Sequence, residues 1–148
     1  MKTRSRMIAS LLIVLTLAAC TSRQERDQAT LEADAAARIQ AIPAPDVQKY
    51  RDVRETKAWR NPYLIVKPEG VALLDVNNNE ERYVNPDELT EVLARLPLSA
   101  WPYGRVVAVA ESAVGGSEDD KARVRKNRAI VAGTLEGMHV AINWIPSA

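Results

Sequence analysis

The sequence has no phenylalanine, one cysteine and one histidine among its 148 residues. Without phenylalanine, the core must be built from Val, Leu, Ile and Ala, with a few Trp and Tyr side chains. The lone histidine, His139, leaves a zinc site or an acid–base pair without a second imidazole, and we expect it at the surface. The single cysteine, Cys20, excludes an internal disulfide.

The patterns of common catalytic sites are also missing. No Gly-rich phosphate loop ends in Lys-Ser or Lys-Thr. No G-x-S-x-G elbow surrounds a serine, and Ser112 and Ser117 have no histidine near them in the sequence. The sequence therefore predicts a protein that is not an enzyme and that has neither a cofactor nor a metal site.

The charge balance argues against some partners. The formal net charge is +1, and Lys2, Arg4 and Arg6 precede the first apolar run, so the rest of the chain is slightly acidic. A slightly acidic chain does not attract nucleic acid or attach to a membrane through a polybasic surface. We expect no nucleic-acid partner.

The N-terminus combines these basic residues with a short apolar run. Residues 7–17 contain only two polar side chains, Ser10 and Thr16. This is the pattern of a secretory signal peptide, and the run is too short to cross a bilayer of ~30 Å as a helix. We expect residues 1–19 to be removed.

The run ends in Leu17-Ala18-Ala19-Cys20, which resembles the bacterial lipobox. The resemblance implies diacylglycerol transfer to the Cys20 sulfur, cleavage before Cys20, and acylation of the new amino terminus by a fatty acid such as palmitate. Several acyl chains anchor a protein stably, whereas one is marginal. The alternative is a coincidental cysteine in an ordinary signal peptide or in an N-terminal membrane anchor.

The residue after Cys20 bears on location. Thr21 stands where an Asp would favour retention at the inner membrane under the lipoprotein sorting pattern of enterobacteria. The predicted location is therefore the cell envelope, with a lipid anchor and the chain facing the periplasm. The outer membrane is favoured over the inner membrane.

Residues 20–60 are expected to form a partly helical tether, and residues 61–148 a compact domain. The first part of the tether favours a short, weakly amphipathic helix because apolar residues recur at intervals of four. Two prolines end that helix. Residues 46–59 are predicted to form a second, charged helix with Asp46 as its N-cap. The spaced apolar residues are Leu31, Ala35 and Ile39, and the prolines are Pro43 and Pro45.

The compact domain begins with strand signals. Residues 63–67 have strand composition, and residues 71–76 are the returning strand of a hairpin. The turn Pro68-Glu69-Gly70 places proline and glycine where their backbone preferences fit. Because the three asparagines at 77–79 tolerate left-handed geometry, residues 82–84 are expected to add a short further strand.

Two helices follow, each with a start signal. Asn85 is the expected N-cap of the first, with Pro86 at its first position. Ser117 and Asp120 form a capping box at the start of the second. Gly137 is expected to provide a left-handed C-terminal cap. The apolar faces are Leu89, Val92, Leu93 and Leu96 in the first helix, and Val124, Val131, Leu135 and Met138 in the second.

Two more strands complete the pattern. Residues 106–110 form a continuous apolar run, which predicts a central strand buried on both faces. Residues 139–145 alternate as a last strand. The order ββαβαβ predicts a small α+β (α/β) domain, with one mixed sheet and two helices on one face. Its strand–helix–strand units require some parallel pairing.

Four stretches of this domain look like one known family. They are residues 63–74, residues 83–96, the strand 106–110, and Gly137 with the strand 140–145. Together they resemble the periplasmic domain of the ExbD/TolR biopolymer-transport family. The resemblance implies a domain that forms a homodimer and that contacts the cell wall or an envelope protein.

Members of that family are anchored by a transmembrane helix whose buried carboxylate serves proton-driven energy transduction. No segment of this sequence matches that helix, so proton coupling does not carry over. A weaker resemblance involves OmpA-like peptidoglycan-binding domains, through Val107-x-Val109, Gly115-Gly116 and Asn127-Arg128-Ala129. The Thr-Asp pair and the helix Asn-x-x-Leu expected of those domains are not in place.

Three basic residues of the second helix are candidates for contact with an anionic partner, because they recur at i, i+4 and i+7 on one stripe. Peptidoglycan carboxylates or lipid phosphates would suit them. The alternative is a solvated face beside the core. The three residues are Lys121, Arg125 and Arg128.

Acidic residues around Gly115-Gly116 suggest a calcium site, but their spacing is not that of an EF-hand loop. Acids at a helix start also stabilise the helix, so capping is the favoured interpretation. These acids are Glu111, Glu118, Asp119 and Asp120.

Three hypotheses about function remain. The favoured one is a lipid-anchored periplasmic binding or assembly module that contacts a protein partner or the cell wall. The second is a small hydrolase or wall-modifying enzyme that uses Glu111 and neighbouring acids. The third is a structural role, with an open sheet edge at residues 63–67 or 139–145 that forms a dimer.

Overall fold

The computed structural model describes residues 26–112 and 116–146. The proposed signal peptide and Cys20 lie outside these residues. The described helices include none that is both long and apolar enough to cross a membrane.

The chain divides into two units, Met1–Asp34 and Ala35–Ala148. In the first unit, residues 26–34 are helical and exposed. Gln28 donates a hydrogen bond from Nε2 to Oε1 of Glu32, 3.0 Å away, one turn along this helix. The second unit carries all the strands and the remaining helices.

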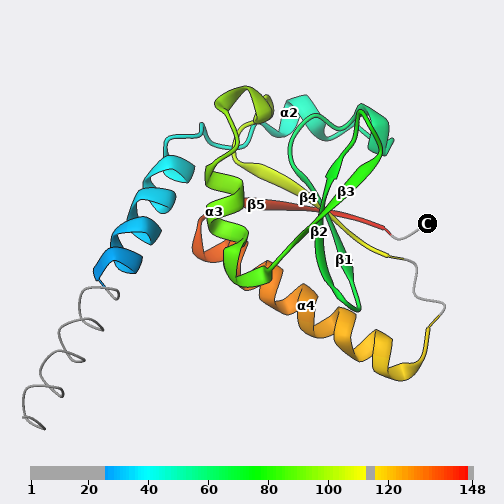
Figure 1. Cartoon of the computed structure of the whole chain (residues 1–148). Coiled ribbons are helices and arrows are strands. Elements are labelled where there is room, and N and C mark those ends of the chain that lie inside the picture. The colour runs from blue at the N-terminus through cyan, green and yellow to red at the C-terminus, as the bar shows by residue number, and fades with distance from the viewer. Residues whose placement is uncertain (1–25, 113–115, 147–148) are drawn as a thin grey trace, which may run out of the picture. The chain divides into compact units, whose positions relative to one another are not determined.

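A five-stranded mixed sheet in the order β3-β2-β1-β4-β5 forms the centre of the second unit (Figure 1). Neighbours β1, β2 and β3 are antiparallel, whereas β4 is parallel to both β1 and β5. The predicted α+β class is confirmed, and the expected further strand is β3. The strands are β1 Tyr63–Lys67, β2 Gly70–Asp75, β3 Glu80–Val84, β4 Val106–Glu111 and β5 Ala141–Ile145.

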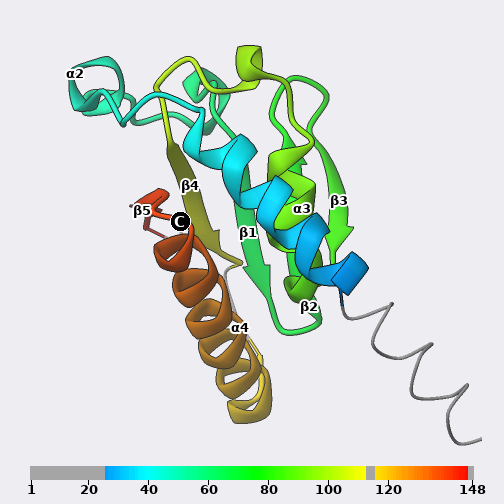
Figure 2. The ribbon, with the colours of Figure 1, turned by 90° about the vertical axis from the view of Figure 1, so that its left-hand side faces the viewer.

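Helices α3 and α4 lie on the same face of this sheet, as Figures 1 and 2 show from two sides. The α-helices within the second unit are α2 Val47–Tyr50, α3 Leu89–Ala94 and α4 Glu118–Gly137, and the 3₁₀ turns are η1 Thr56–Ala58, η2 Pro86–Glu88 and η3 Leu98–Ala100. Residues 35–40 are also helical.

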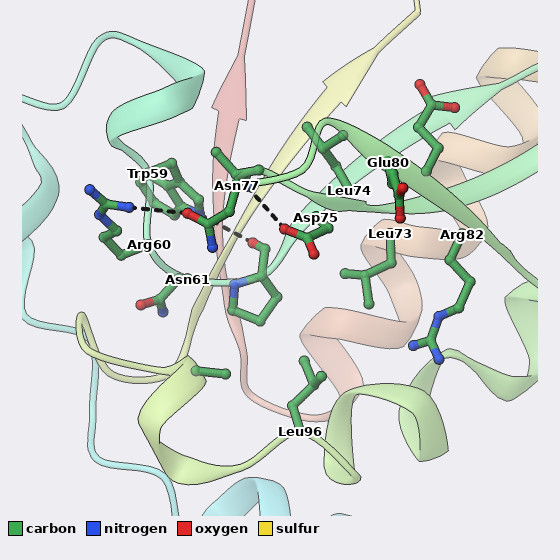
Figure 3. Close-up of a pocket in the computed structure, with 14 residues that line it drawn as sticks. Trp59, Arg60, Asn61, Leu73, Leu74, Asp75, Asn77, Glu80, Arg82 and Leu96 are labelled. Atoms are coloured by element: carbon green, nitrogen blue, oxygen red, sulfur yellow. Dashed lines mark hydrogen bonds between the residues drawn. The ribbon is translucent and has the colours of Figure 1, made fainter.

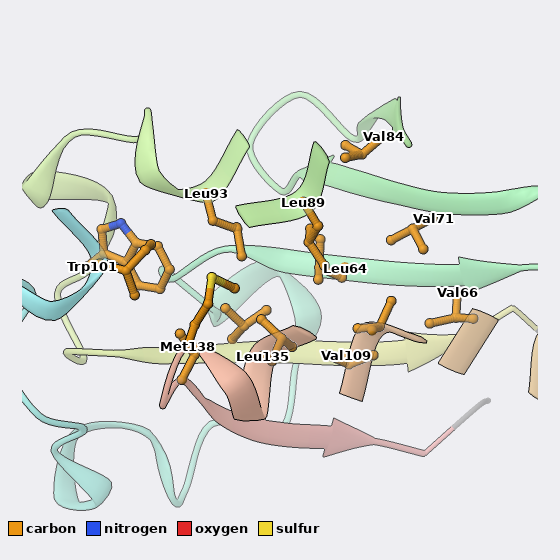
Figure 4. Close-up of a cluster of buried hydrophobic side chains, with 14 of the residues drawn as sticks. Leu64, Val66, Val71, Val84, Leu89, Leu93, Trp101, Val109, Leu135 and Met138 are labelled. Atoms are coloured by element: carbon orange, nitrogen blue, oxygen red, sulfur yellow. The ribbon is translucent and has the colours of Figure 1, made fainter. Parts of the chain in front are cut away.

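The main core lies between the sheet and these helices (Figure 4). Alternation along the strands turns Leu64 and Val66 of β1 and Val109 of β4 toward the helices. From the helices come the predicted faces, with Leu89 and Leu93 of α3 fully buried. Val124, Val131 and Leu135 of α4 and Met138 at its C-cap are buried as predicted. Strand β4 is buried on both faces, as its unbroken apolar run indicated.

Both predicted helix starts are confirmed. The Asn85 side chain accepts a hydrogen bond from the backbone N–H of Asp87 at 3.3 Å. Ser117 and Asp120 form the reciprocal capping box, each side chain accepting from the other residue's backbone.

The expected left-handed cap at Gly137 is wrong. Helix α4 includes Gly137, and the chain reverses at His139, whose φ is 55°. The physical reason is Met138, which is buried and still adopts right-handed helical geometry, so the turn can only follow it. His139 is exposed, as expected, and the last strand begins after it.

The compact unit begins at Ala35 rather than at residue 61. Ile39 and Ile42 are buried in the core on the helix side of the sheet, and Trp59 is buried on the other side. Because apolar residues are sparse in this segment, its sequence looks like a tether. Each of the three side chains is nevertheless packed in a core. Their burial depends on tertiary contacts, which cannot be predicted from the periodicity of the sequence.

The helix predicted over residues 46–59 is much shorter in the structure. Asp46 is its N-cap, accepting from the N–H of Gln48 at 3.2 Å, but α2 ends at Tyr50. Trp59 does not continue a helical stripe. Its ring instead packs edge-on against Tyr50 and Tyr103, with centroids 5.7 and 5.2 Å away. These three rings cover one end of the sheet face that α3 and α4 leave free.

The strand order decides which edges are open. Strand β1 lies at the centre of the sheet, so the expectation that residues 63–67 form an open edge is wrong. The two edges are β3 and β5. Of the two candidate edges named from the sequence, only the one at β5 remains.

Candidate functional site

A groove of about 540 Å³ lies between the start of β1, the β2–β3 hairpin and the segment that follows α3 (Figure 3). Its apolar part includes Pro62 before β1, Leu73 of β2, and Leu96 and Ala100 after α3. Trp59, Leu74 and Val76 also line it, and the rest of the lining consists of charged and amide side chains: Arg60, Asn61, Asp75, Asn77, Glu80, Glu81 and Arg82.

Asp75 is held in place at the rim by the hairpin turn. Its Oδ1 accepts the backbone N–H groups of Asn77 and Asn78 at 2.9 and 3.3 Å, and Asn78 donates from its side chain to Oδ2 at 2.8 Å. These donors, led by Asn78, hold the pKa of Asp75 below its ordinary value. The turn itself closes at Asn79, where φ is 55°, in agreement with the left-handed geometry expected of this asparagine run.

The two arginines of the groove have few partners among the described residues. Arg60 donates from Nη1 to the neutral side chain of Asn77 at 3.5 Å. Arg82 is exposed and forms no hydrogen bond or ion pair with a described side chain. Glu81, by contrast, is paired with Lys67, and this hydrogen bond is the main reason that the pKa of Lys67 is raised. The rim thus offers two available guanidinium groups.

A buried asparagine fixes the wall of the groove beside Arg60. Asn61 is 4% exposed and is the one buried polar residue found in the described chain. It donates to the carbonyl oxygens of Gly104 and Val106 at 2.7 and 2.8 Å, and accepts from the N–H of Tyr103 at 2.8 Å. Three hydrogen bonds to backbone groups hold this wall rigidly, so the groove is formed before any ligand arrives.

The lining of the groove sets what chemistry it can support. Its lining residues include no Ser, Thr, Cys, His or Lys, so the carboxylates of Asp75, Glu80 and Glu81 are its only groups that could serve as nucleophile or base. The described residues also contain no group of three or more His, Cys, Asp or Glu side chains placed to hold a metal ion. An apolar floor beside guanidinium, amide and carboxylate groups suits a ligand that joins an apolar part to peptide amides, with a carboxylate directed at the arginines.

The three basic residues predicted on α4 have different surroundings. Lys121 forms an ion pair with Glu118 at 2.8 Å. Arg128 bonds Glu111 at the end of β4, with 2.7 Å between Nη1 and Oε1, and its guanidinium lies 4.3 Å from the ring centre of Trp144 on β5. Arg125 is exposed and has no ion-pair partner in the described chain.

Three of the four acidic residues named from the sequence have partners in the described structure. Glu111 pairs with Arg128 and Glu118 with Lys121. Asp120 belongs to the capping box and lies 3.5 Å from Arg123, while Asp119 is exposed in the first turn of α4. Capping is thus confirmed for Asp120. Residues 113–115, which include part of the glycine pair, lie outside the described residues.

Sequence reasoning missed the groove. Its residues are spread from Trp59 to Ala100, and none of them forms a motif with its neighbours. Arg60 was assigned to a tether, and Asn61 is a single polar residue before a strand. The asparagine run after β2 was the only local signal, and it indicated a turn rather than a binding surface.

Comparisons with family models, curated proteins and solved structures found no match to this chain.

Proposed function

We propose that this chain is a lipid-anchored binding or assembly module of the cell envelope that uses the groove to hold a partner protein or the cell wall. The groove between the start of β1, the β2–β3 hairpin and the segment after α3 carries this proposal, because it joins an apolar floor to available arginines. Its lining includes no Ser, Thr, Cys, His or Lys. The module has no proton coupling and no enzymatic activity of its own.

The lipobox-like sequence gives the place of action. Acylation at Cys20 would hold the chain on the periplasmic side of a membrane, with the outer membrane favoured. In that setting, peptidoglycan offers peptide carboxylates and amides, and an envelope protein offers extended acidic segments. Both present the groups that Arg60 and Arg82 are suited to bind.

The test is binding of the whole acylated chain to isolated sacculi and to envelope proteins. Arg82→Glu should weaken binding about tenfold, because it replaces attraction by repulsion inside the groove. Arg54→Glu makes the same charge change at an exposed position outside the groove and should leave binding unchanged. Equal binding by the parent chain and Arg82→Glu would contradict the proposal.

The OmpA-like alternative gives a different result in the same experiment. It requires binding to sacculi that depends on Asn127 and Arg128 and not on the groove. In the structure, Asn127 donates from Nδ2 to the carbonyl oxygens of Lys67 and Pro68 at 2.8 and 3.4 Å. Because these bonds hold α4 against the β1–β2 turn, they give Asn127 a role in the fold.

A further inference from the structure

The two edges of the sheet differ in how they are protected. Strand β3 has Glu80, Glu81 and Arg82 within its five residues. Such charges keep an edge from pairing with other strands. Strand β5 has the sequence Ala-Ile-Asn-Trp-Ile, with no charged residue, and no described segment pairs with its outer edge.

The outer edge of β5 offers backbone hydrogen-bonding groups. Ala141 donates its N–H to the carbonyl of Arg105, which places the backbone groups of Ala141 on the β4 side of the parallel ladder. Alternation along a strand then turns the N–H and C=O groups of Ile142 and Trp144 outward. A strand added here would form a regular ladder with both residues.

Two basic side chains lie beside this edge, Arg125 without an ion-pair partner in the described chain and Arg128 paired with Glu111. The side chains of Ile142 and Trp144 point to the α4 face of the sheet, where Arg128 lies over the Trp144 ring. Successive residues of an α-helix are rotated by about 100° around its axis. Arg125 therefore lies about 100° around α4 from the buried Val124, and Arg128 is rotated from Val124 in the same direction. A residue paired opposite Trp144 would therefore place its side chain next to Arg128 and Arg125.

This charge pattern distinguishes two occupants. A second copy would pair its β5 antiparallel about a two-fold axis, and the two α4 helices would then lie on the same face of one continuous sheet. Lys121 and Arg128 are paired with acids in each copy, but the two Arg125 side chains, which have no ion-pair partner in the described chain, would face each other and repel. An extended segment with acidic side chains meets no such repulsion.

We propose that the outer edge of β5 binds an extended, acidic segment of a partner protein as an added strand. Acidic side chains at alternate positions of that segment reach Arg125 and Arg128 on α4. The edge is separate from the groove, so the two binding activities are measured independently and the loss of one leaves the other in place.

The experiment uses the whole chain in detergent and fluorescent synthetic peptides that alternate Glu with Val or Lys with Val. The acidic peptide should bind and the basic one should not. Arg125→Glu should weaken binding of the acidic peptide about tenfold, because attraction becomes repulsion. Lys126→Glu is the matched control, since Lys126 is exposed and about 200° around the helix from Val124.

A second variant tests the backbone of the edge. Ile142→Pro removes an outward N–H and spares the ladder to β4, so it should weaken binding at least about tenfold while thermal unfolding stays cooperative. Absence of acidic-peptide binding, equal binding of both peptides, or equal weakening by Arg125→Glu and Lys126→Glu would overturn the proposal. A dimer in sedimentation that Ile142→Pro converts to monomer would also overturn it, because a second copy would then occupy the edge.

Discussion

Gly104 has a φ of 78°, in the left-handed region, and a Cβ on it would overlap the backbone carbonyl of Ala44. Gly104→Ala should therefore lower the free energy of unfolding by about 2 kcal/mol or more, since backbone must shift. Gly133 is in α4 with open space around it, so Gly133→Ala should raise that free energy by about 0.5–1 kcal/mol. Urea unfolding of the two variants measures both changes in the free energy of unfolding, one a decrease and the other an increase. A similar loss in both would contradict this description.

Through Asp75, the stability of the folded chain should depend on pH. Its folded pKa lies below its ordinary value because Asn78 and Asn77 donate to its carboxylate. The stability that it contributes is therefore complete above the unfolded pKa of about 4 and is lost as pH falls through the folded pKa. Asp75→Asn should flatten the acid side of the stability profile, measured by urea midpoints from neutral pH downward. An unchanged acid dependence would exclude this role.

Helix α4 depends on its capping box. Ser117→Ala removes the acceptor for the N–H of Asp120 and should lower the free energy of unfolding by about 1 kcal/mol. Ser99→Ala, at an exposed position in η3 that has no side-chain hydrogen bond in the structure, should change it by less than about 0.5 kcal/mol. Thermal unfolding measures the stability of both variants. An equal change in stability in the two would show that the capping box does not stabilise the helix.

The elements that the sequence predicts well are those with local causes. Asn85-Pro86 and the Ser117–Asp120 box are start signals read within one turn, and both proved correct. The run at residues 106–110 is apolar without interruption, and its strand is buried on both faces. The cap at Gly137 failed because the position of the turn depends on burial of Met138, which no local signal contains.

The strand edges were only partly predictable for the same reason. Residues 63–67 form a strand as expected, but periodicity does not give the order of strands in a sheet. Parallel pairing with β4 places β1 at the centre and leaves β5 at the edge. The basic stripe of α4 was visible in the sequence, whereas the stacking of Arg128 on Trp144 required the fold.

At the scale of the whole molecule, the segment before β1 belongs to the domain. Ile39, Ile42 and Trp59 are almost completely buried, and loss of each large apolar contact costs about 2–4 kcal/mol. A chain that begins at residue 61 should therefore lose cooperative unfolding or melt far below the full chain. A chain that begins at residue 35 should retain a sharp transition. Equal melting temperatures of the two truncated chains would contradict this boundary.

The groove shows why sites are harder to predict than elements. Arg60, Leu73, Arg82 and Leu96 are brought together only when the hairpin packs beside α3. Each has an ordinary local explanation in the sequence, as a tether, strand or helix residue. The buried bonds of Asn61, which hold the wall, likewise join residues more than 40 positions apart.

The most direct test of the proposed role is the chemical state of Cys20, since binding in the envelope requires the anchor. Mass spectrometry of the chain isolated from bacterial membranes should find an N-terminal peptide that begins at Cys20 and carries diacylglyceryl and acyl groups. An unmodified Cys20 would contradict the account, whether residues 1–19 are retained or the chain is cleaved at a site other than the bond before Cys20.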